Sequence, residues 1–185
     1  CDKKCKSLHE HNEQEVSAQI IKILNNSDID IDIALVSDAG TPTISDPGYH
    51  LIQKCIDNNI EFTLIPGPSS VINALVLSGL PTSSFSFLGF VPRKKLQNIQ
   101  FIQSLKKEKN TIILFESAKR IKNTLVCIAD EYSKDKKISL CREMTKFYEN
   151  IERGTAVSLL KKINNGEIIL KGEFVIVIEP FALKD

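Results

Sequence analysis

The sequence of 185 residues has no tryptophan, one methionine and three histidines. So few histidines disfavour a reaction that depends on His-based acid–base chemistry. No apolar run approaches the roughly 18 residues of a membrane-spanning helix. The chain also lacks the basic start and apolar stretch of a secretory signal. Five cysteines, an odd number with no C-x-x-C pair, are typical of a reduced protein. These absences predict a cytoplasmic protein with no membrane span.

Several motifs of catalytic and nucleotide sites are also missing. The sequence contains no G-x-x-x-x-G-K-[ST] loop, no G-x-G-x-x-G turn and no G-x-S-x-G elbow. These absences exclude a P-loop, an ordinary dinucleotide site and a serine nucleophile on a strained turn. Cys1, Cys5, His9 and His11 form a C-x3-C-x3-H-x-H cluster of possible zinc ligands. The spacers are too short for an ordinary zinc finger, so we expect no metal site.

The charge is unevenly distributed, although the composition is that of an ordinary globular protein, with 42% hydrophobic residues and a net charge of +1. Residues 1–92 carry 5 basic and 11 acidic side chains, a net −6, whereas residues 93–124 carry 9 basic and 2 acidic ones, a net +7. The basic block is either a surface for a polyanion or a solvated helix face. There are only four arginines, which bind anions in a bidentate manner better than lysine does: Arg93, Arg120, Arg142 and Arg153.

Helical and strand patterns alternate along the chain, which predicts an α/β fold. The predicted helices cover residues 12–25, 46–57, 69–78, 94–109, 120–132 and 156–163. The predicted strands cover residues 33–36, 61–65, 85–90, 111–115, 137–142, 149–154 and 173–179. The segment Pro81-Thr82-Ser83-Ser84 is the best candidate for a boundary between domains at 1–82 and 83–185.

Ligands of open α/β sheets gather beyond the carboxyl ends of strands. The loops 37–48 and 66–70 follow predicted strands, and they are either tight turns or ligand-binding loops. Charged clusters at 116–120 and 142–146 also follow strands, and they are either two walls of one site or salt-bridged loops. In the segment 89–95, an aromatic side chain precedes three cations, a combination that can stack on a base and hold phosphates.

Several segments together carry a family resemblance. They are A-L-V-S-D-A-G-T-P-T-I-S-D-P-G-Y-H (34–50), P-G-P-S-S (66–70), G-F-V-P-R-K (89–94), F-E-S-A-K-R (115–120) and R-E-M-T-K (142–146). In this order they closely resemble the bacterial small-subunit ribosomal RNA 2′-O-ribose methyltransferases that act on a cytidine of the decoding centre. That family belongs to the tetrapyrrole methylase-like superfamily, and the resemblance extends from about His9 to Glu179.

The resemblance implies two α/β domains with S-adenosylmethionine in the cleft between them, a homodimer, and ribosomal RNA within the small subunit as the substrate. Family members begin with a strand and a Pro-Ile-Gly-Asn-like loop, which this sequence does not contain. Because the chain also starts at Cys1 rather than at methionine, we expect a member with an incomplete N-terminal domain. Ser70 and Phe115 stand where the family commonly has Ala and Tyr.

Individual residues have candidate roles: the resemblance implies the cofactor contacts, whereas the RNA contacts and catalytic groups follow from the charged and aromatic residues at the predicted strand ends. The implied cofactor-binding residues are Asp38, Ala39, Gly40, Thr41, Pro42, Ile44, Ser69, Ser70, Phe115 and Met144. The candidates for RNA contacts are Phe90, Arg93, Lys94, Arg120 and Arg142. Glu116, Glu143 and Lys146 are unranked candidates for catalysis, as a base or as a cation beside a developing oxyanion.

Two alternatives stay open. One is methylation of a small tetrapyrrole by the same fold, and the other is an RNA-binding module without catalytic activity. The central basic block and the segment G-F-V-P-R-K favour RNA over a tetrapyrrole.

Overall fold

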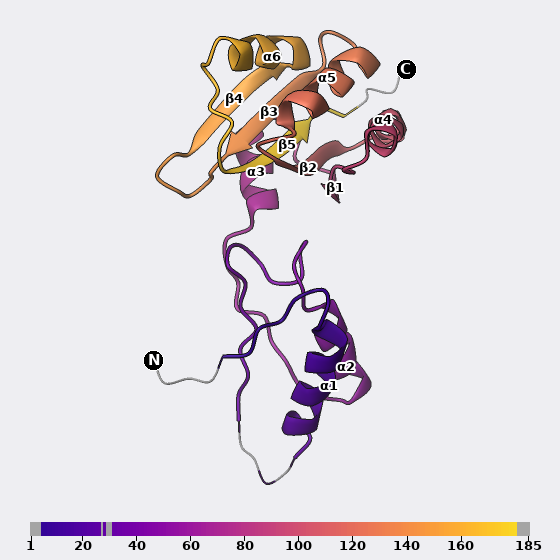
Figure 1. Ribbon diagram of the computed structural model, residues 1–185, viewed down its shortest axis with the longest axis vertical. Helices are drawn as coiled ribbons and strands as arrows, with labels where there is room; N and C mark the ends of the chain where they lie inside the picture. Colours follow the sequence, from indigo (N-terminus) through magenta and orange to yellow (C-terminus); the bar gives the residue numbers. More distant parts are fainter. Residues whose placement is uncertain (1–4, 27, 29–30, 181–185) are drawn as a thin grey trace. The chain divides into compact units, whose positions relative to one another are not determined.

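The computed structural model describes residues 5–26, 28 and 31–180. The chain forms two compact units, Cys1–Ser69 (unit 1) and Ser70–Asp185 (unit 2), each of which is described by itself (Figure 1). Within the described residues, no helix has both the length and the apolar character that crossing a membrane requires.

Unit 2 is built on a five-stranded mixed sheet. Its strands are β1 (Phe85–Phe90), β2 (Thr111–Ser117), β3 (Lys137–Arg142), β4 (Asn150–Thr155) and β5 (Glu173–Ile178), in the spatial order β1-β2-β5-β3-β4. β1 and β2 are parallel, and the other neighbouring pairs are antiparallel. All five strands predicted for this part of the chain are confirmed, because their apolar runs and alternation are backed by partners in the sheet.

Helices cover both faces of this sheet (Figure 1). α4 (Lys95–Ser104), extended by the 3-10 turn η1 (Leu105–Lys107), packs on one face with α5 (Ile121–Glu131) and α6 (Ala156–Asn164). α3 (Ser70–Ser78) packs on the other face. Side chains alternate along β2, so Leu114 faces the first core and Ile113 faces the core under α3.

Arg153 holds the end of α3 against the sheet. Its Nε donates to the carbonyl of Ser78 at 3.2 Å, and its Nη2 donates to the carbonyl of Leu77. The last carbonyls of a helix lack partners within the helix, and a cation there also suits the helix dipole. Arg153 therefore has a structural role.

The predicted domain boundary at 82/83 assigns α3 to the first domain, whereas α3 packs within unit 2. That boundary stays a prediction.

Unit 1 contains the helices α1 (Glu13–Leu24) and α2 (Tyr49–Asp57), which pack through Ile21, Leu51 and Cys55. The buried carboxylate of Glu13 accepts hydrogen bonds from the backbone N–H groups of Gly48 and His50 at 2.8 and 2.9 Å. Glu13 thus satisfies free donors at the start of α2 from a different helix. Both helices were predicted, and α2 begins later than expected because Gly48, with φ 133°, precedes it.

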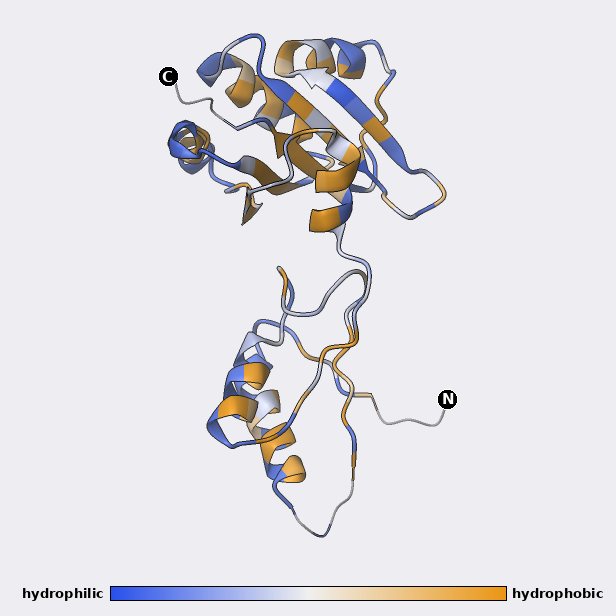
Figure 2. Cartoon of the chain, turned by 180° about the vertical axis from the view of Figure 1, so that it is seen from behind, coloured by the Kyte–Doolittle hydropathy of each residue, from blue (hydrophilic) through white to orange (hydrophobic). Residues whose placement is uncertain are grey.

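The strands predicted at 33–36 and 61–65 are wrong. Both segments lack regular secondary structure, and Val36, Leu64 and Ile65 are 80%, 68% and 86% exposed. Figure 2 shows hydrophobic residues along the extended segments of unit 1 as well as on its helices. A strand needs a neighbour that accepts and donates its backbone hydrogen bonds. An apolar pattern cannot supply that partner, and the described part of unit 1 contains no paired strand.

Candidate functional site

The carboxyl ends of three strands meet at one edge of the unit 2 sheet. β1 runs parallel to β2, while β2 and β3 are both antiparallel to β5, which lies between them. β1, β2 and β3 therefore end at the same edge, where β5 begins with Glu173 beside Ser117. We call this the C-terminal edge. The charged clusters at 116–120 and 142–146 both lie there, at the position where α/β sheets bind ligands.

Glu116 is buried, and its side chain has no exposed surface. Oε1 accepts a hydrogen bond from the N–H of Ser117 at 2.7 Å and forms an ion pair with Nη2 of Arg120 at 2.6 Å. Oε2 accepts a hydrogen bond from the hydroxyl of Thr124, on α5, at 2.7 Å. Both carboxylate oxygens are thus held by the protein, on the opposite side of β2 from Phe115.

Arg120 connects the ends of β1 and β2. Nη1 donates to the carbonyl of Val91 at 2.9 Å, and Nε donates to the hydroxyl of Ser117 at 3.2 Å. With Nη2 on Glu116, all three guanidinium nitrogens have protein partners. Arg93 and Lys94 follow two and three residues after Val91, whose carbonyl Arg120 holds. Both are exposed and have no side-chain partner in the described part of the chain.

Three phenylalanines form an aromatic cluster at the C-terminal edge. The ring of Phe115 lies edge-to-face against Phe87 and Phe90, with centroid distances of 4.8 and 5.3 Å. Phe87, Phe115 and Met144 are half-buried against the core under α3. The structure thus gathers two predicted cofactor residues, Phe115 and Met144, and the predicted RNA contact Phe90, and it adds Phe87.

In unit 1, the two predicted cofactor loops touch at one point. The hydroxyl of Thr41 donates to the carbonyl of Pro68 at 3.5 Å, next to Ser69. Asp38, Ala39, Gly40 and Ile44 are exposed and Pro42 is half-buried, while Ser70 begins α3 in unit 2. The loop contains two non-glycine residues with positive φ, Thr43 at 72° and Ser45 at 62°. Positive φ angles at non-glycine residues are uncommon and occur at tight turns as well as at functional sites, so the loop stays a candidate binding loop.

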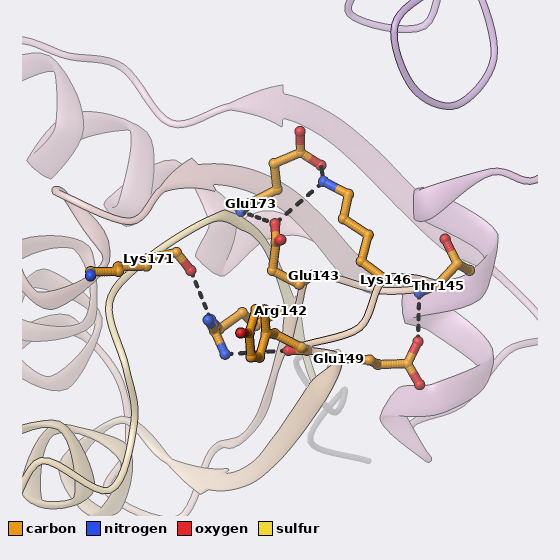
Figure 3. A network of polar contacts seen from close by, with 8 residues as sticks. Arg142, Glu143, Thr145, Lys146, Glu149, Lys171 and Glu173 are labelled. Atoms are coloured by element: carbon orange, nitrogen blue, oxygen red, sulfur yellow. Dashed lines mark hydrogen bonds and ion pairs between the residues drawn. The ribbon is translucent and has the colours of Figure 1, made fainter.

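The loop that joins β3 to β4 is organised by charged side chains (Figure 3). Oε1 of Glu143 accepts hydrogen bonds from the N–H of Glu173 at 2.8 Å and from Nζ of Lys146 at 3.3 Å. Nζ of Lys146 also pairs with Oε2 of Glu173 at 2.9 Å. Arg142 donates through Nε to the carbonyl of Lys171 at 2.7 Å and through Nη1 to that of Tyr148 at 3.3 Å. We call these contacts the β3–β4 network.

Comparison with known proteins shows the family. The sequence profile of the tetrapyrrole (corrin/porphyrin) methylases matches residues 2–160. The chain belongs to this family. The sequence resemblance is thus confirmed at the level of the superfamily.

Curated relatives carry the name ribosomal RNA small subunit methyltransferase I. The chain is 42% identical over 177 residues to the protein of Halalkalibacterium halodurans, covering 94% of this chain and 58% of that protein. It is 42% identical over 176 residues to the protein of a Hydrogenobaculum species, covering 94% and 74%. It is 36% identical over 173 residues to the protein of Escherichia coli O157:H7, covering 94% and 59%. The chain thus spans less than two thirds of the length of several of these relatives.

Solved structures of other proteins share the fold. Diphthine synthase superposes with a TM-score of 0.60 at 14% identity, covering 93% of this chain and 68% of that protein. A cobalt precorrin-4 methyltransferase superposes with a TM-score of 0.55 at 19% identity, covering 76% and 61%. These likenesses confirm the α/β fold of the tetrapyrrole methylases.

Cys1, a member of the sequence cluster of possible zinc ligands, lies outside the described residues. The rings of His9 and His11 lie edge-to-face, with centroids 6.0 Å apart. Within 5–26, 28 and 31–180, no group of three or more possible metal ligands comes together.

The sequence did not single out Phe147 and Tyr148, which lie in the loop of the β3–β4 network, nor Glu173, which pairs with Lys146. Two adjacent aromatic residues in an otherwise polar loop were the available signal for the first two. The role of Glu173 was not visible, because it depends on pairing between strands distant in sequence.

The β3–β4 network has a defined pH range. The hydrogen bond from the N–H of Glu173 lowers the pKa of Glu143 below its ordinary 4.5. The hydrogen bond to the carboxylate of Glu173 raises the pKa of Lys146 above its ordinary 10.5. The stabilisation of the network by the ionised Glu143 is fully present above the pKa that Glu143 has in the unfolded chain. It is lost as the pH falls through the lowered pKa of the folded protein. The stabilisation by protonated Lys146 is fully present below the pKa that Lys146 has in the unfolded chain. It is lost as the pH rises through the raised pKa of the folded protein.

We therefore expect the β3–β4 network to stay intact from about pH 5 to about pH 10 and to loosen outside that window. NMR titration of the Glu143 carboxyl and of the backbone amides of residues 143–149 measures this. In a Lys146→Gln variant, the transition at the alkaline end should disappear while the acidic one remains. A loop transition of the wild type between pH 6 and 9 would contradict the assignment.

Proposed function

We propose that this protein takes part in the S-adenosylmethionine-dependent methylation of small-subunit ribosomal RNA, at the ribose 2′-hydroxyl of a cytidine in the decoding centre. The names of relatives at 36–42% identity support ribosomal RNA as the substrate. The structural observation that carries the proposal is the C-terminal edge, where the exposed cations Arg93 and Lys94 follow the aromatic side chain of Phe90. Cations beside an exposed aromatic ring suit a nucleic acid.

The candidate cofactor residues fall into two groups, one in each unit. In unit 1, the exposed loop that contains Asp38 and Gly40 offers a carboxylate and an accessible backbone, since a Cβ at Gly40 would meet no atom within 4 Å. In unit 2, the half-buried surface of Phe87, Phe115 and Met144 suits a flat adenine ring. Both groups fit S-adenosylmethionine, which when bound supplies a methyl group on a sulfonium. We propose Pro42, Ile44, Ser69 and Ser70 as further contacts.

The side chains of the edge indicate how the protein assists methyl transfer. Lys146 is a cation at neutral pH, paired with the carboxylates of Glu173 and Glu143, and we propose that it stabilises negative charge that develops on the ribose oxygen. The lowered pKa of Glu143 makes it a weak proton acceptor. Glu116 is enclosed, and we assign it a positioning role through Arg120. Catalysis then rests mainly on holding the ribose oxygen in line with the methyl group.

The double substitution Arg93→Ala with Lys94→Ala should weaken RNA binding. Each lost phosphate contact should lower the slope of log affinity against log salt by roughly 0.7–0.9. Titration of labelled small-subunit ribosomal RNA fragments at several salt concentrations measures this slope. Affinity for S-adenosylmethionine should barely change, because neither side chain belongs to the proposed cofactor groups.

A triple substitution of Lys106, Lys107 and Lys109 to Ala is the matched control. Nζ of Lys106 already pairs with Glu131 at 2.9 Å, and these lysines lie at or beyond the far end of α4 from Lys94. We expect a smaller loss of RNA affinity from this triple variant. A larger loss would show that the RNA lies on a different face of unit 2.

The alternatives have distinct outcomes. Transfer of label from S-adenosylmethionine to small ribosomal subunits supports the proposal, whereas transfer to a tetrapyrrole alone supports small-molecule methylation. RNA binding without cofactor binding in calorimetry supports a non-catalytic module. We also propose a homodimer in the cytoplasm, and analytical ultracentrifugation tests the dimer.

A further inference from the structure

Two aromatic side chains are displayed on the loop between β3 and β4. Phe147 is 92% exposed and Tyr148 is 64% exposed, and their rings lie edge-to-face with centroids 4.9 Å apart. Figure 1 shows this loop projecting beyond the sheet of unit 2. Leaving a large apolar side chain in water forfeits the free energy that its burial would release. Adjacent exposed aromatic residues therefore indicate a binding surface.

The loop that carries them is held in one shape. The N–H of Thr145 donates to the Glu149 carboxylate at 2.7 Å, which closes the loop on itself (Figure 3). Arg142 clamps the carbonyls of Lys171 and Tyr148. Glu143 and Thr145 adopt positive φ angles of 48° and 63°, a strained conformation that the surrounding contacts maintain. The aromatic pair is thus presented on a preorganised loop, which lowers the entropic cost of binding.

A pocket of about 260 Å³ lies beside the aromatic pair. Its lining consists of Arg142, Phe147, Tyr148, Glu149, Asn150, Glu167 and Ile169. Nη2 of Arg142 has no hydrogen-bond partner among the residues that the structure describes. The lining thus combines flat aromatic surface with a guanidinium donor, an amide and two carboxylate acceptors.

This combination matches the edge and the faces of a nucleobase. Carboxylates accept from the amino groups of bases, guanidinium and amide groups bind ring nitrogens and carbonyls, and aromatic rings stack on base faces. The two carboxylates disfavour a phosphate at the same place. From these features we infer that the pocket binds an unstacked base of single-stranded RNA, an inference that rests on the proposed RNA substrate. It adds a base contact, separate from the phosphate contacts of Arg93 and Lys94.

The absence of tryptophan from the sequence allows a direct test. A Phe147→Trp variant has a single indole at the pocket, and a stacked base should quench its fluorescence. The control variant is Val157→Trp, at an exposed position on α6, which follows the opposite end of β4. The probe is a mixed-sequence single-stranded RNA of about ten nucleotides, and the same strand annealed to its complement. We expect the single strand, and not the duplex, to quench the Phe147→Trp variant, and neither RNA to quench the Val157→Trp variant.

The double variant Phe147→Ala with Tyr148→Ala provides a second measurement. Loss of one stacked base should lower single-strand affinity about tenfold. The salt slope should stay unchanged, because no phosphate contact is lost, in contrast to the Arg93→Ala, Lys94→Ala variant.

Three results would overturn the inference. If RNA binds the Phe147→Trp variant without quenching its indole fluorescence, the pocket does not bind a base. The proposed methyl transfer is measured separately and is not affected by this result. Equal quenching by the duplex excludes recognition of an unstacked base. The third result is quenching that rises with protein concentration in the absence of RNA, together with a dimer that the double alanine variant no longer forms. The aromatic pair would then bind a second copy of this chain rather than RNA.

Discussion

Replacing Glu116 with Ala should lower the free energy of unfolding by about 3–5 kcal/mol, because it breaks a buried ion pair and leaves its partners unsatisfied. The side chain of Arg120 is 25% exposed, whereas that of Glu116 is fully enclosed. Removing the carboxylate also takes away the acceptor for the hydroxyl of Thr124 and for the N–H of Ser117. Urea denaturation followed by circular dichroism measures the change.

The control is Glu131→Ala, which breaks the surface pair with Lys106. An exposed ion pair contributes little to stability because solvent screens it, so this variant should be almost as stable as the wild type. Glu116→Gln keeps the shape and part of the hydrogen bonding, and it should lie between the two. Equal losses for Glu116→Ala and Glu131→Ala would show that the enclosed pair contributes little.

Glu116→Gln also tests the positioning role. Arg120 holds the carbonyl of Val91, immediately before the turn that carries Arg93. A less firmly held Arg120 should weaken RNA binding even where the variant stays folded. Methyl transfer from bound complexes should change less than RNA affinity, whereas loss of a catalytic group would lower the rate at saturating RNA.

Gly172→Ala should have the second largest effect, a loss of roughly 3 kcal/mol of stability together with disruption of the β3–β4 network. Gly172 has a φ of 86°, where an L side chain is strained. A Cβ there would also meet the Glu143 carboxyl carbon at 2.4 Å, which is too close for two non-bonded atoms. The carboxylate must move, and it then releases the N–H of Glu173 and Nζ of Lys146.

Gly166→Ala is the control that separates backbone strain from the close contact with Glu143. Gly166 has a similar φ of 77°, but a Cβ there would meet no atom within 4 Å. This variant should lose about 1–2 kcal/mol from backbone strain alone and should leave the network intact. The acidic transition of Glu143 in NMR should therefore change in Gly172→Ala only. A Gly172→Ala variant with a wild-type Glu143 titration would contradict the close packing of the two residues.

The comparison of unit 1 with unit 2 shows where sequence patterns sufficed. The strand pattern at 111–115 is matched by β2, whose neighbours β1 and β5 provide hydrogen-bonding partners on both sides. The equally apolar segment 33–36 forms no strand in the structure. Periodicity describes one segment at a time, whereas a strand also depends on its neighbour.

The candidate site shows the same division. Sequence reasoning placed the charged clusters beyond strand ends, and the strand order brings them to one edge. It could not tell that Glu116 points to the helix-covered face while Phe115 points to the other, since the face depends on packing. The proposed base pocket could not be predicted from the sequence either, because the pocket is lined by the β3–β4 loop together with Glu167 and Ile169, which are distant in sequence.

The sequence by itself determined the family, because the motifs and their order along the chain can be recognised without a structure. It also determined the order of helices and strands in unit 2. Only the tertiary structure decided which arginines hold backbone carbonyls. Arg120, Arg142 and Arg153 bind backbone carbonyls that lie 29, 29 and 75 residues away in sequence, whereas Arg93 has no such partner in the described part of the chain. The physical reason is that strand and helix ends leave carbonyls unpaired, and which guanidinium reaches them is set by the fold rather than by neighbouring residues.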